Sequence, residues 1–341
     1  MSKSRISVKL EVDVRHLAAG ILTLTMSFLA ACSSRVPTAA PTQVPTDPGL
    51  TPAKETGPAN TDVLSLEALM NAVYSGIYPE PVKLSNGIYV GLPFAAGDPA
   101  RPTLEYVDGE EIFGDLDGDG VEDAAVFLLE RGGGTAAFTY VAAQLNRNGQ
   151  PVDAGAALVE DRTQVRSAFV QNGQIVLDIT TRGPGDPDCC PTHKIRKIYA
   201  LQADRLVEEP VERQSLAKIS IGDLYGTSWR LLEMDTGIPA LADAEITISF
   251  QEDQISGSGG CNDYNSRFSL HSVNPFIITI NPVAVTQQAC PDPLLNQENA
   301  YYAALENASL WGYNYGKLVL AYADGQDGDL KLLLFAPLEA P

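Results

Sequence analysis

The sequence predicts a mainly β, α+β fold: two antiparallel β-rich domains, each with about one helix, behind an export signal and a disordered linker. Three observations predict it. Alternating apolar runs bounded by turn residues fill residues 61–212 and 221–341, one helical pattern occurs in each range, and proline-rich sequence precedes both. A chain of 341 residues has room for two such domains. The net charge of −20 excludes nucleic acid as a partner, because a phosphate backbone requires a basic surface.

Residues 1–31 have the features of a bacterial export signal. Basic residues near the start precede an apolar run at 17–31 that is short for a transmembrane helix. The run ends in the tetrapeptide LAAC at residues 29–32, which resembles the lipobox of bacterial lipoproteins. The resemblance implies cleavage before Cys32 and lipidation of this cysteine, hence a protein anchored to the bacterial cell membrane on its extracytoplasmic side. An ordinary signal peptide and an uncleaved anchor are the alternatives.

Residues 32–60 form the expected linker behind the lipidated cysteine. Residues 33–60 contain six prolines and five threonines without periodic apolar positions, so this segment cannot bury enough surface to fold. Fully extended, it would span roughly 90 Å at most. An acidic protein is not attracted to anionic lipid headgroups, so we expect the acyl chains alone to provide the membrane contact.

The first domain, residues 61–212, is expected to begin with a short amphipathic helix that is capped near Thr61 and ends near Gly76. Its inward residues would be Leu66, Leu69, Met70 and Val73. Strands are expected at 87–90, 123–130, 137–145, 164–171, 174–181 and 194–201. Asn172-Gly173 separates two alternating runs by two residues, which predicts a β-hairpin.

The sharpest local motif is an aspartate-rich loop between Gly114 and the strand expected at 123–130. Aspartates at alternate positions, followed by a glycine that permits a sharp turn, aim several carboxylates at one point, and hard oxygen ligands at this spacing suit Ca²⁺. The candidate ligands are the side chains of Asp115, Asp117, Asp119 and Asp123 and the backbone carbonyl of Val121.

This loop resembles the D-x-D-x-D-G-x-x-D calcium loops of integrin-type FG-GAP repeats and, more loosely, those of EF-hands and dockerins. It does not repeat, so no propeller is implied, and the bidentate glutamate of an EF-hand is missing. The resemblance implies that these residues bind Ca²⁺, and in an exported protein we expect such an ion to be weakly bound and structural. The alternative is an Asp/Gly-rich turn on an acidic surface.

A second unusual segment places Cys189 beside Cys190, near His193. In an exported protein we expect these cysteines to form a structural disulfide, either with each other or with other cysteines. Zinc ligation and redox chemistry are the alternatives.

The second domain, residues 221–341, opens with a strand around Trp229. Further strands are expected at 246–250, 277–280, 317–321 and 330–335. A helix is expected from Pro293 to Asn307, since proline is favoured in the first turn. The rings of Trp311, Tyr313 and Tyr315 would lie on one strand face, as core packing or alternatively as a ligand platform.

Several separated blocks of this domain share a family pattern: GTSW at 226–229, SGSGGCNDY at 256–264, VTQQAC at 285–290, and Glu298 on the following helix. Their order resembles the META (HslJ-like) domain. The resemblance implies a compact β-rich domain with one helix and a disulfide between Cys261 and Cys290. Intermolecular pairing, free thiols and cross-domain pairings are the alternatives. Members are mostly exported bacterial proteins linked to stress or drug tolerance, and no catalytic residues are established for the family.

The sequence contains few candidate catalytic residues or motifs. Only His193 and His271 follow the signal, and neither a serine elbow nor a phosphate-binding glycine loop is present. Glu298, Glu306 and Asp263 are interpreted as solvated surface charges. We therefore expect a non-enzymatic envelope lipoprotein, structural and stress-protective or binding an envelope protein, peptide, glycan or cationic ligand. A hydrolase that uses acidic residues is the alternative.

Overall fold

The structure is a computed structural model of the whole chain. It describes residues 63–95, 100–133, 136–187, 190–203, 205–210, 217–235, 237–323 and 330–338. The expected signal, the lipidated Cys32, the linker and Cys189 lie outside the described residues. In the described part, no helix combines the length and the apolar character that a membrane span requires. The described residues belong to one compact unit.

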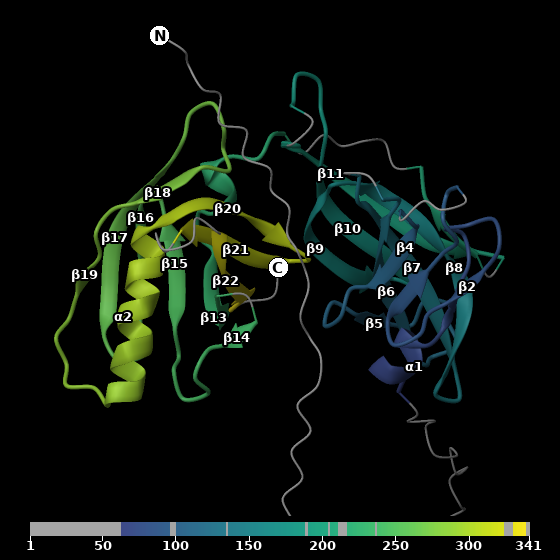
Figure 1. Cartoon of the computed structure of the whole chain (residues 1–341), viewed down its shortest axis with the longest axis horizontal. Helices are drawn as coiled ribbons and strands as arrows, with labels where there is room; N and C mark the ends of the chain where they lie inside the picture. The colour runs from purple at the N-terminus through teal and green to yellow at the C-terminus, as the bar shows by residue number, and fades with distance from the viewer. Residues whose placement is uncertain are drawn as a thin grey trace, which may run out of the picture. The chain divides into compact units, whose positions relative to one another are not determined.

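The described residues are mainly β, and their strands pair antiparallel (Figure 1). Two α-helices accompany the strands in this part of the chain. The predicted fold class is therefore confirmed. The division into domains at 61–212 and 221–341 stays a prediction, and we refer below to residues 63–210 as the N-terminal β region.

A six-stranded sheet forms the centre of the N-terminal β region. Its strands, in spatial order, are β3 (Ile88–Val90), β4 (Thr103–Tyr106), β6 (Asp123–Arg131), β7 (Phe138–Arg147) and β8 (Gln150–Asp161), with β5 (Ile112–Gly114) paired to β6. Strand β6 is buried on both faces from Asp123 to Leu128. Ala125 and Phe127 join one hydrophobic cluster, whereas the residues that alternate with them join another. The sheet therefore has a core on each side.

Short elements cover one side of this sheet: helix α1 (Leu66–Met70) and the pair β1 (Val73–Tyr74) and β2 (Val82–Lys83). The helix begins later and ends earlier than predicted. The Ser65 side chain caps it by accepting a hydrogen bond from Ala68 N, and Asn71 ends it. Val73 pairs with Lys83 and is exposed, and Leu66 is exposed as well. The prediction that both face inward was wrong: Val73 belongs to a strand that begins just after the helix, and Leu66 is the first residue of the short helix.

A four-stranded sheet covers the other side, in the order β12 (Arg205–Glu208), β11 (His193–Gln202), β10 (Gln174–Thr181) and β9 (Gln164–Gln171). Its residues Ile175, Leu177 and Ile179 share a cluster with Phe127. The turn between β9 and β10 has positive φ at both Asn172 (52°) and Gly173 (75°). This conformation is the one that favours an Asn-Gly pair in a two-residue hairpin, as predicted.

The C-terminal residues form a ten-stranded sheet. Its main path runs through β18 (Ile278–Ile280), β17 (Asp263–Leu270), β16 (Gln254–Ser258), β15 (Thr247–Gln251), β13 (Ser228–Met234), β22 (Leu330–Pro337), β21 (Lys317–Ala323) and β20 (Ala308–Asn314). Strand β14 (Ile238–Pro239) pairs with β13, and β19 (Ala284–Val285) pairs with β17. A β-bridge between Ile277 and Leu310 brings the two ends of the path together. A short 3-10 helix, Ile221–Asp223, precedes the sheet.

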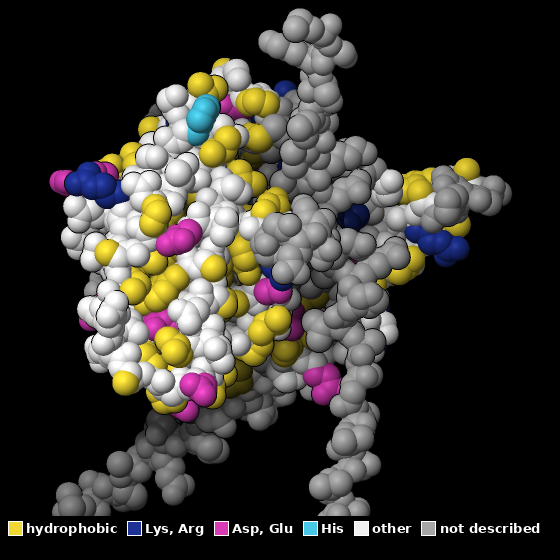
Figure 2. Space-filling model, turned by 60° about the vertical axis from the view of Figure 1, so that its left-hand side comes forward, with side chains coloured by type: hydrophobic (Ala, Val, Ile, Leu, Met, Phe, Trp, Pro, Cys, Tyr) yellow, Lys and Arg dark blue, Asp and Glu magenta, His cyan; other side chains and the backbone are white. Residues whose placement is uncertain are grey.

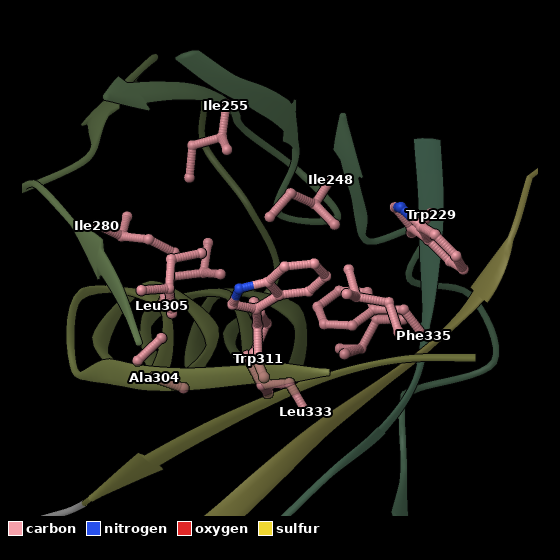
Figure 3. Packing of buried hydrophobic residues seen from close by; sticks show 14 of the residues in the cluster. Trp229, Ile248, Ile255, Ile280, Ala304, Leu305, Trp311, Leu333 and Phe335 are labelled. Atoms are coloured by element: carbon pink, nitrogen blue, oxygen red, sulfur yellow. The ribbon is translucent and has the colours of Figure 1, made fainter. Parts of the chain in front are cut away.

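Helix α2 (Asp292–Glu306) packs into the core of this sheet. Figure 3 shows Ala304 and Leu305 of the helix near Trp311, with Phe335 and Trp229 further along the same cluster. The Trp311 indole donates to Pro275 O at 2.6 Å. Trp311 is therefore a core residue, as the packing interpretation predicts.

The turn after β20 contacts the N-terminal β region. Tyr315 lies in this turn with φ 48°, and its ring packs against Phe127 at a centroid distance of 4.8 Å. Gly316 N donates to Val165 O at 2.9 Å. The expectation of three rings on one strand face is thus wrong for Tyr315, because the strand ends at Asn314.

Candidate functional site

The aspartate-rich loop lies between β5 and β6 and is fixed at both ends. Leu116 inserts into the core beside Phe127, and Asp123 is fully buried at the start of β6. Gly118 and Gly120 have φ of 82° and 85° with open space around them, so the backbone conformation requires glycine there.

The carboxylates hold the loop through its own backbone. Asp115 accepts hydrogen bonds from Gly118 N at 2.7 Å and from Gly120 N at 3.0 Å. Asp119 accepts one from Val121 N at 2.8 Å. Asp123 accepts from Leu116 N at 2.9 Å and, across the sheet, from Asn146 N at 2.8 Å. The turn is therefore preformed by its acidic side chains.

Three of the four predicted carboxylates converge. Asp115, Asp117 and Asp123 each place one oxygen within 4.8 Å of the others, close enough to share a cation. Asp119 is not part of this group, and its Oδ2 instead accepts from Arg147 Nη1 at 2.8 Å. The backbone N–H of Val121 donates the hydrogen bond to Asp119 described above.

Arg147, at the end of β7, is a residue of this site that the sequence motif does not reveal. Its guanidinium pairs with both Asp117 and Asp119. Burial tends to raise the pKa of Asp117, but hydrogen bonds from Arg147 and the backbone hold it below its usual value. Burial raises the pKa of Asp123, only partly offset by its two backbone donors. The cross-strand position of β7 against β6 brings Arg147 to the loop.

A second constellation, around Glu298 of α2, corrects the sequence interpretation. Its side chain is buried, 1% exposed, so its interpretation as a solvated surface charge was wrong. The carboxylate accepts from Asn262 N at 2.6 Å, from Asn262 Nδ2 at 2.8 Å and from the Tyr302 hydroxyl at 3.1 Å. Burial alone would raise the pKa of Glu298, but these hydrogen bonds, together with one from Cys261 N, lower it. The ionised carboxylate thus stabilises the loop before β17.

Asn262 extends this network to the next loop. Its Oδ1 accepts from Gln288 N at 2.7 Å and from Thr286 Oγ1 at 3.1 Å. Cys261 and Cys290 form a disulfide with a Cα–Cα distance of 6.2 Å, so the pair that the resemblance implies is joined. Three of the four blocks that carry the resemblance, 256–264, 285–290 and Glu298, therefore meet at one place, where they tie two loops to α2.

The histidines and the remaining cysteines assemble no comparable site. Cys190 takes part in a disulfide, whereas Cys189 lies outside the described residues. His193 Nδ1 lies 3.2 Å from the buried carboxylate of Asp186. His271 is exposed, and its Nδ1 accepts from two backbone N–H groups of its own turn. Among the described residues, only the aspartate loop brings three or more His, Cys, Asp or Glu side chains close enough to hold a metal.

Acidic side chains do not form a patch on the one face that Figure 2 shows. On the face shown in Figure 2, Asp and Glu are scattered among hydrophobic and uncharged side chains. Many are paired, as Asp178 is with Arg196 at 2.8 Å. The aspartate loop is therefore the feature that stands out as a candidate site.

The fold and the sequence of the C-terminal residues together define the class of domain to which they belong. Residues 222–332 match the META domain family. The chain therefore carries a META domain at its C-terminal end. No curated protein matches the chain.

Two solved structures, both determined by NMR, are similar to part of the chain. One shares 24% identity over 35% of this chain and 94% of its own length, with a TM-score of 0.29. The other, from Burkholderia xenovorans, shares 22% identity over 39% of this chain and 98% of its own, with a TM-score of 0.28.

Proposed function

We propose that the chain is a non-enzymatic lipoprotein of the bacterial envelope, anchored through lipidated Cys32, whose META domain has a structural or stress-protective role. The observation that carries the proposal is the network around Glu298. Its disulfide, its buried carboxylate and Asn262 all hold loops to helix α2. A disulfide in this position suits an oxidising compartment outside the cytoplasm. The LAAC sequence at 29–32 supports the same location.

The surroundings of the histidines support the non-enzymatic part. The Nδ1 atom of His193 is paired with Asp186, and that of His271 accepts a hydrogen bond from the backbone of its own turn. Among the described residues, neither is hydrogen-bonded to a serine or cysteine that it would activate as a nucleophile. The residues lie in different parts of the chain and share no site.

A structural Ca²⁺ ion at the aspartate loop is part of the same proposal. Asp115, Asp117 and Asp123 would hold it, since converging carboxylate oxygens suit a hard cation. The ion would neutralise acidic groups that Arg147 leaves unpaired and would stabilise the loop between β5 and β6. It would supply no reaction chemistry.

The anchoring is tested by replacing Cys32. Expressed in a bacterium, the wild-type chain is expected in the membrane fraction and to incorporate labelled fatty acid, whereas Cys32→Ala is expected to lose both, since no thiol remains to carry the acyl chains. Ala39→Ser in the linker is the control. A Cys32→Ala protein that still carries labelled lipid contradicts the proposal.

The protective role is tested in the source bacterium. A strain without the gene is expected to be more sensitive to heat or envelope-active drugs, and the wild-type gene is expected to restore tolerance. If the two strains tolerate these stresses equally, the protective role is refuted.

A further inference from the structure

A glutamate without a basic partner lies among aromatic rings on one face of the six-stranded sheet. Glu130 is half-buried near the end of β6, and no lysine, arginine or histidine of the described residues forms an ion pair with it. Burial raises the pKa of Glu130 above its usual value, and the Tyr78 hydroxyl offsets only part of this rise. A partly buried carboxylate that lacks a cation is costly unless something compensates its charge.

The strand register places aromatic residues around this carboxylate. Glu130 is directly opposite Phe138 on β7 and opposite Leu104 on β4, and Leu104 is in turn opposite Tyr89 on β3. Residues directly opposite each other point to the same face of a sheet. Tyr140, two residues after Phe138, also points to that face. One sheet face thus carries Tyr89, Phe138 and Tyr140 around Glu130.

Tyr78 adds a ring from the loop between β1 and β2. The centroids of the Tyr78 and Tyr89 rings are 5.7 Å apart, and the ring planes are inclined at 49°. The two rings therefore pack against each other in a tilted arrangement. The Tyr78 hydroxyl is buried and makes no well-formed hydrogen bond within the described residues. Burial raises the pKa of Tyr78, and the nearby charge of Glu130 raises it further.

The residues around Glu130 are only partly buried. A Cβ built on Gly132 would lie 3.8 Å from Glu130 Oε1 and 3.9 Å from Phe94 Cζ, so these two side chains border the same position. Tyr78, Tyr89 and Tyr140 pack against the core cluster of this face, and all three are half-buried. Phe94 is 60% exposed. Among the described residues, Glu130 and the rings around it are therefore all partly exposed to solvent.

We propose that Glu130, Tyr78, Tyr89 and Tyr140 bind the alkylammonium group of an organic cation. Tyrosine faces attract ammonium groups through the ring quadrupole, and a carboxylate supplies the opposite charge. A hard metal ion is a poor fit, because it needs several oxygen ligands and this cluster offers one carboxylate. An anion would be repelled. A neutral sugar could stack on the rings, but it would leave the charge of Glu130 uncompensated.

The test is isothermal titration calorimetry of the full mature chain with three alkylammonium probes: spermidine, choline and Nα-acetyl-lysine methylamide. They separate a free polyamine, a quaternary headgroup and a lysine side chain as sources of the same chemistry. Glucose serves as the neutral probe. We expect at least one ammonium probe to bind with a Kd below about 10 mM, more weakly as salt increases, and glucose not to bind.

Matched variants identify the site. Glu130→Gln keeps the shape but removes the charge, and Tyr78→Leu removes a ring; each is expected to weaken binding about ten-fold or more. Glu105→Gln is the control, because Glu105 is also half-buried but is adjacent to Leu104 on β4 and so points to the opposite face. Tyr78→Phe keeps the ring and is expected to retain binding. Circular dichroism of each variant checks that it is folded.

The proposal is overturned by any of three results: no ammonium probe binds, folded Glu130→Gln binds as the wild type does, or glucose binds as well as the cations. Equal losses in Glu130→Gln and Glu105→Gln would indicate nonspecific attraction to an acidic protein and would also refute it. None of these results bears on lipid anchoring at Cys32, which is measured independently.

Discussion

At the scale of single residues, Glu298 shows how position in space decides the role of a charge. Along the sequence it lies on a polar helix, where a carboxylate usually faces water. In the structure it faces the backbone of the loop before β17, and a Cβ on Gly259 would come within 2.7 Å of Glu298 Oε1. The absence of a side chain at Gly259 therefore lets the carboxylate reach Asn262 N.

The first prediction concerns Glu298→Gln. This variant keeps the volume but presents an amide to the donors of Asn262, and we expect it to lower the free energy of unfolding by roughly 1–3 kcal/mol near neutral pH. Because the folded-state pKa of Glu298 is lowered, its contribution is complete above the unfolded value of about 4.3 and is lost as pH falls through the folded value. The difference between wild type and variant should therefore shrink in acid.

Urea unfolding at several pH values between about 3 and 7 measures this difference. Glu306→Gln is the matched control on the same helix, since Glu306 is exposed and accepts one bond, from Val283 N at 2.9 Å. A deficit that stays constant from neutral to acid pH would show that the charge of Glu298 plays no part.

At the scale of elements, the loop between β5 and β6 is a preformed turn with two competing sources of positive charge. Arg147 takes Asp117 and Asp119, while Asp115, Asp117 and Asp123 converge. The second prediction follows from this competition. Ca²⁺ should raise the melting temperature of the wild type at concentrations of about 10⁻⁴–10⁻³ M, and Asp115→Asn should abolish the effect.

Arg147→Gln removes the competing cation, so we expect it to bind Ca²⁺ severalfold more tightly, although it is less stable without calcium. Thermal melts and calorimetry with and without Ca²⁺ measure both effects. Asp253→Asn, an exposed aspartate paired with Arg267, is the control and should respond as the wild type does. Identical calcium responses of wild type and Asp115→Asn would contradict the calcium proposal.

The elements that the sequence predicted well are those with one strong local signal. The hairpin at Asn172-Gly173 and helix α2 behind its proline lie within a few residues of their expected positions. Strand β8 was missed because its exposed and buried positions do not alternate regularly. Strand β17 was missed because a polar residue, Ser266, takes a buried position between Tyr264 and Phe268 and interrupts the apolar alternation. Arg147 could not be found from the loop motif, since the β6–β7 pairing alone brings it there.

At the scale of the whole molecule, the N-terminal β region contacts the META domain at two places. One is the turn that carries Tyr315, and the other is a cluster of charged residues around Asp223. Tyr315 packs on Phe127, and burial raises the pKa of Tyr315 to about 12. Asp223 accepts from Lys194 at 2.5 Å and lies 3.5 Å from Arg166. Arg166 also stands over the Tyr313 ring at 5.8 Å. We infer that the two regions unfold together.

The third prediction is that Tyr315→Ala weakens this coupling. Losing a half-buried ring should cost about 1–3 kcal/mol and should separate the thermal unfolding of the two regions into two transitions. Scanning calorimetry measures the transitions. Tyr315→Phe keeps the ring and should behave as the wild type does. Tyr225→Ala should do so as well, because Tyr225 is 42% exposed. A single unchanged transition in Tyr315→Ala would mean that the coupling resides elsewhere.

The turn at Tyr315 also has an evolutionary consequence. Gly316 faces the backbone of β9, and Tyr315 fills a space beside Phe127, so substitutions on either side change the space available to the other. These positions cannot diverge independently in proteins that combine both regions, and we expect them to co-vary there. META domains that occur without such a partner region are free of this constraint, and their equivalent turn is expected to carry a polar residue.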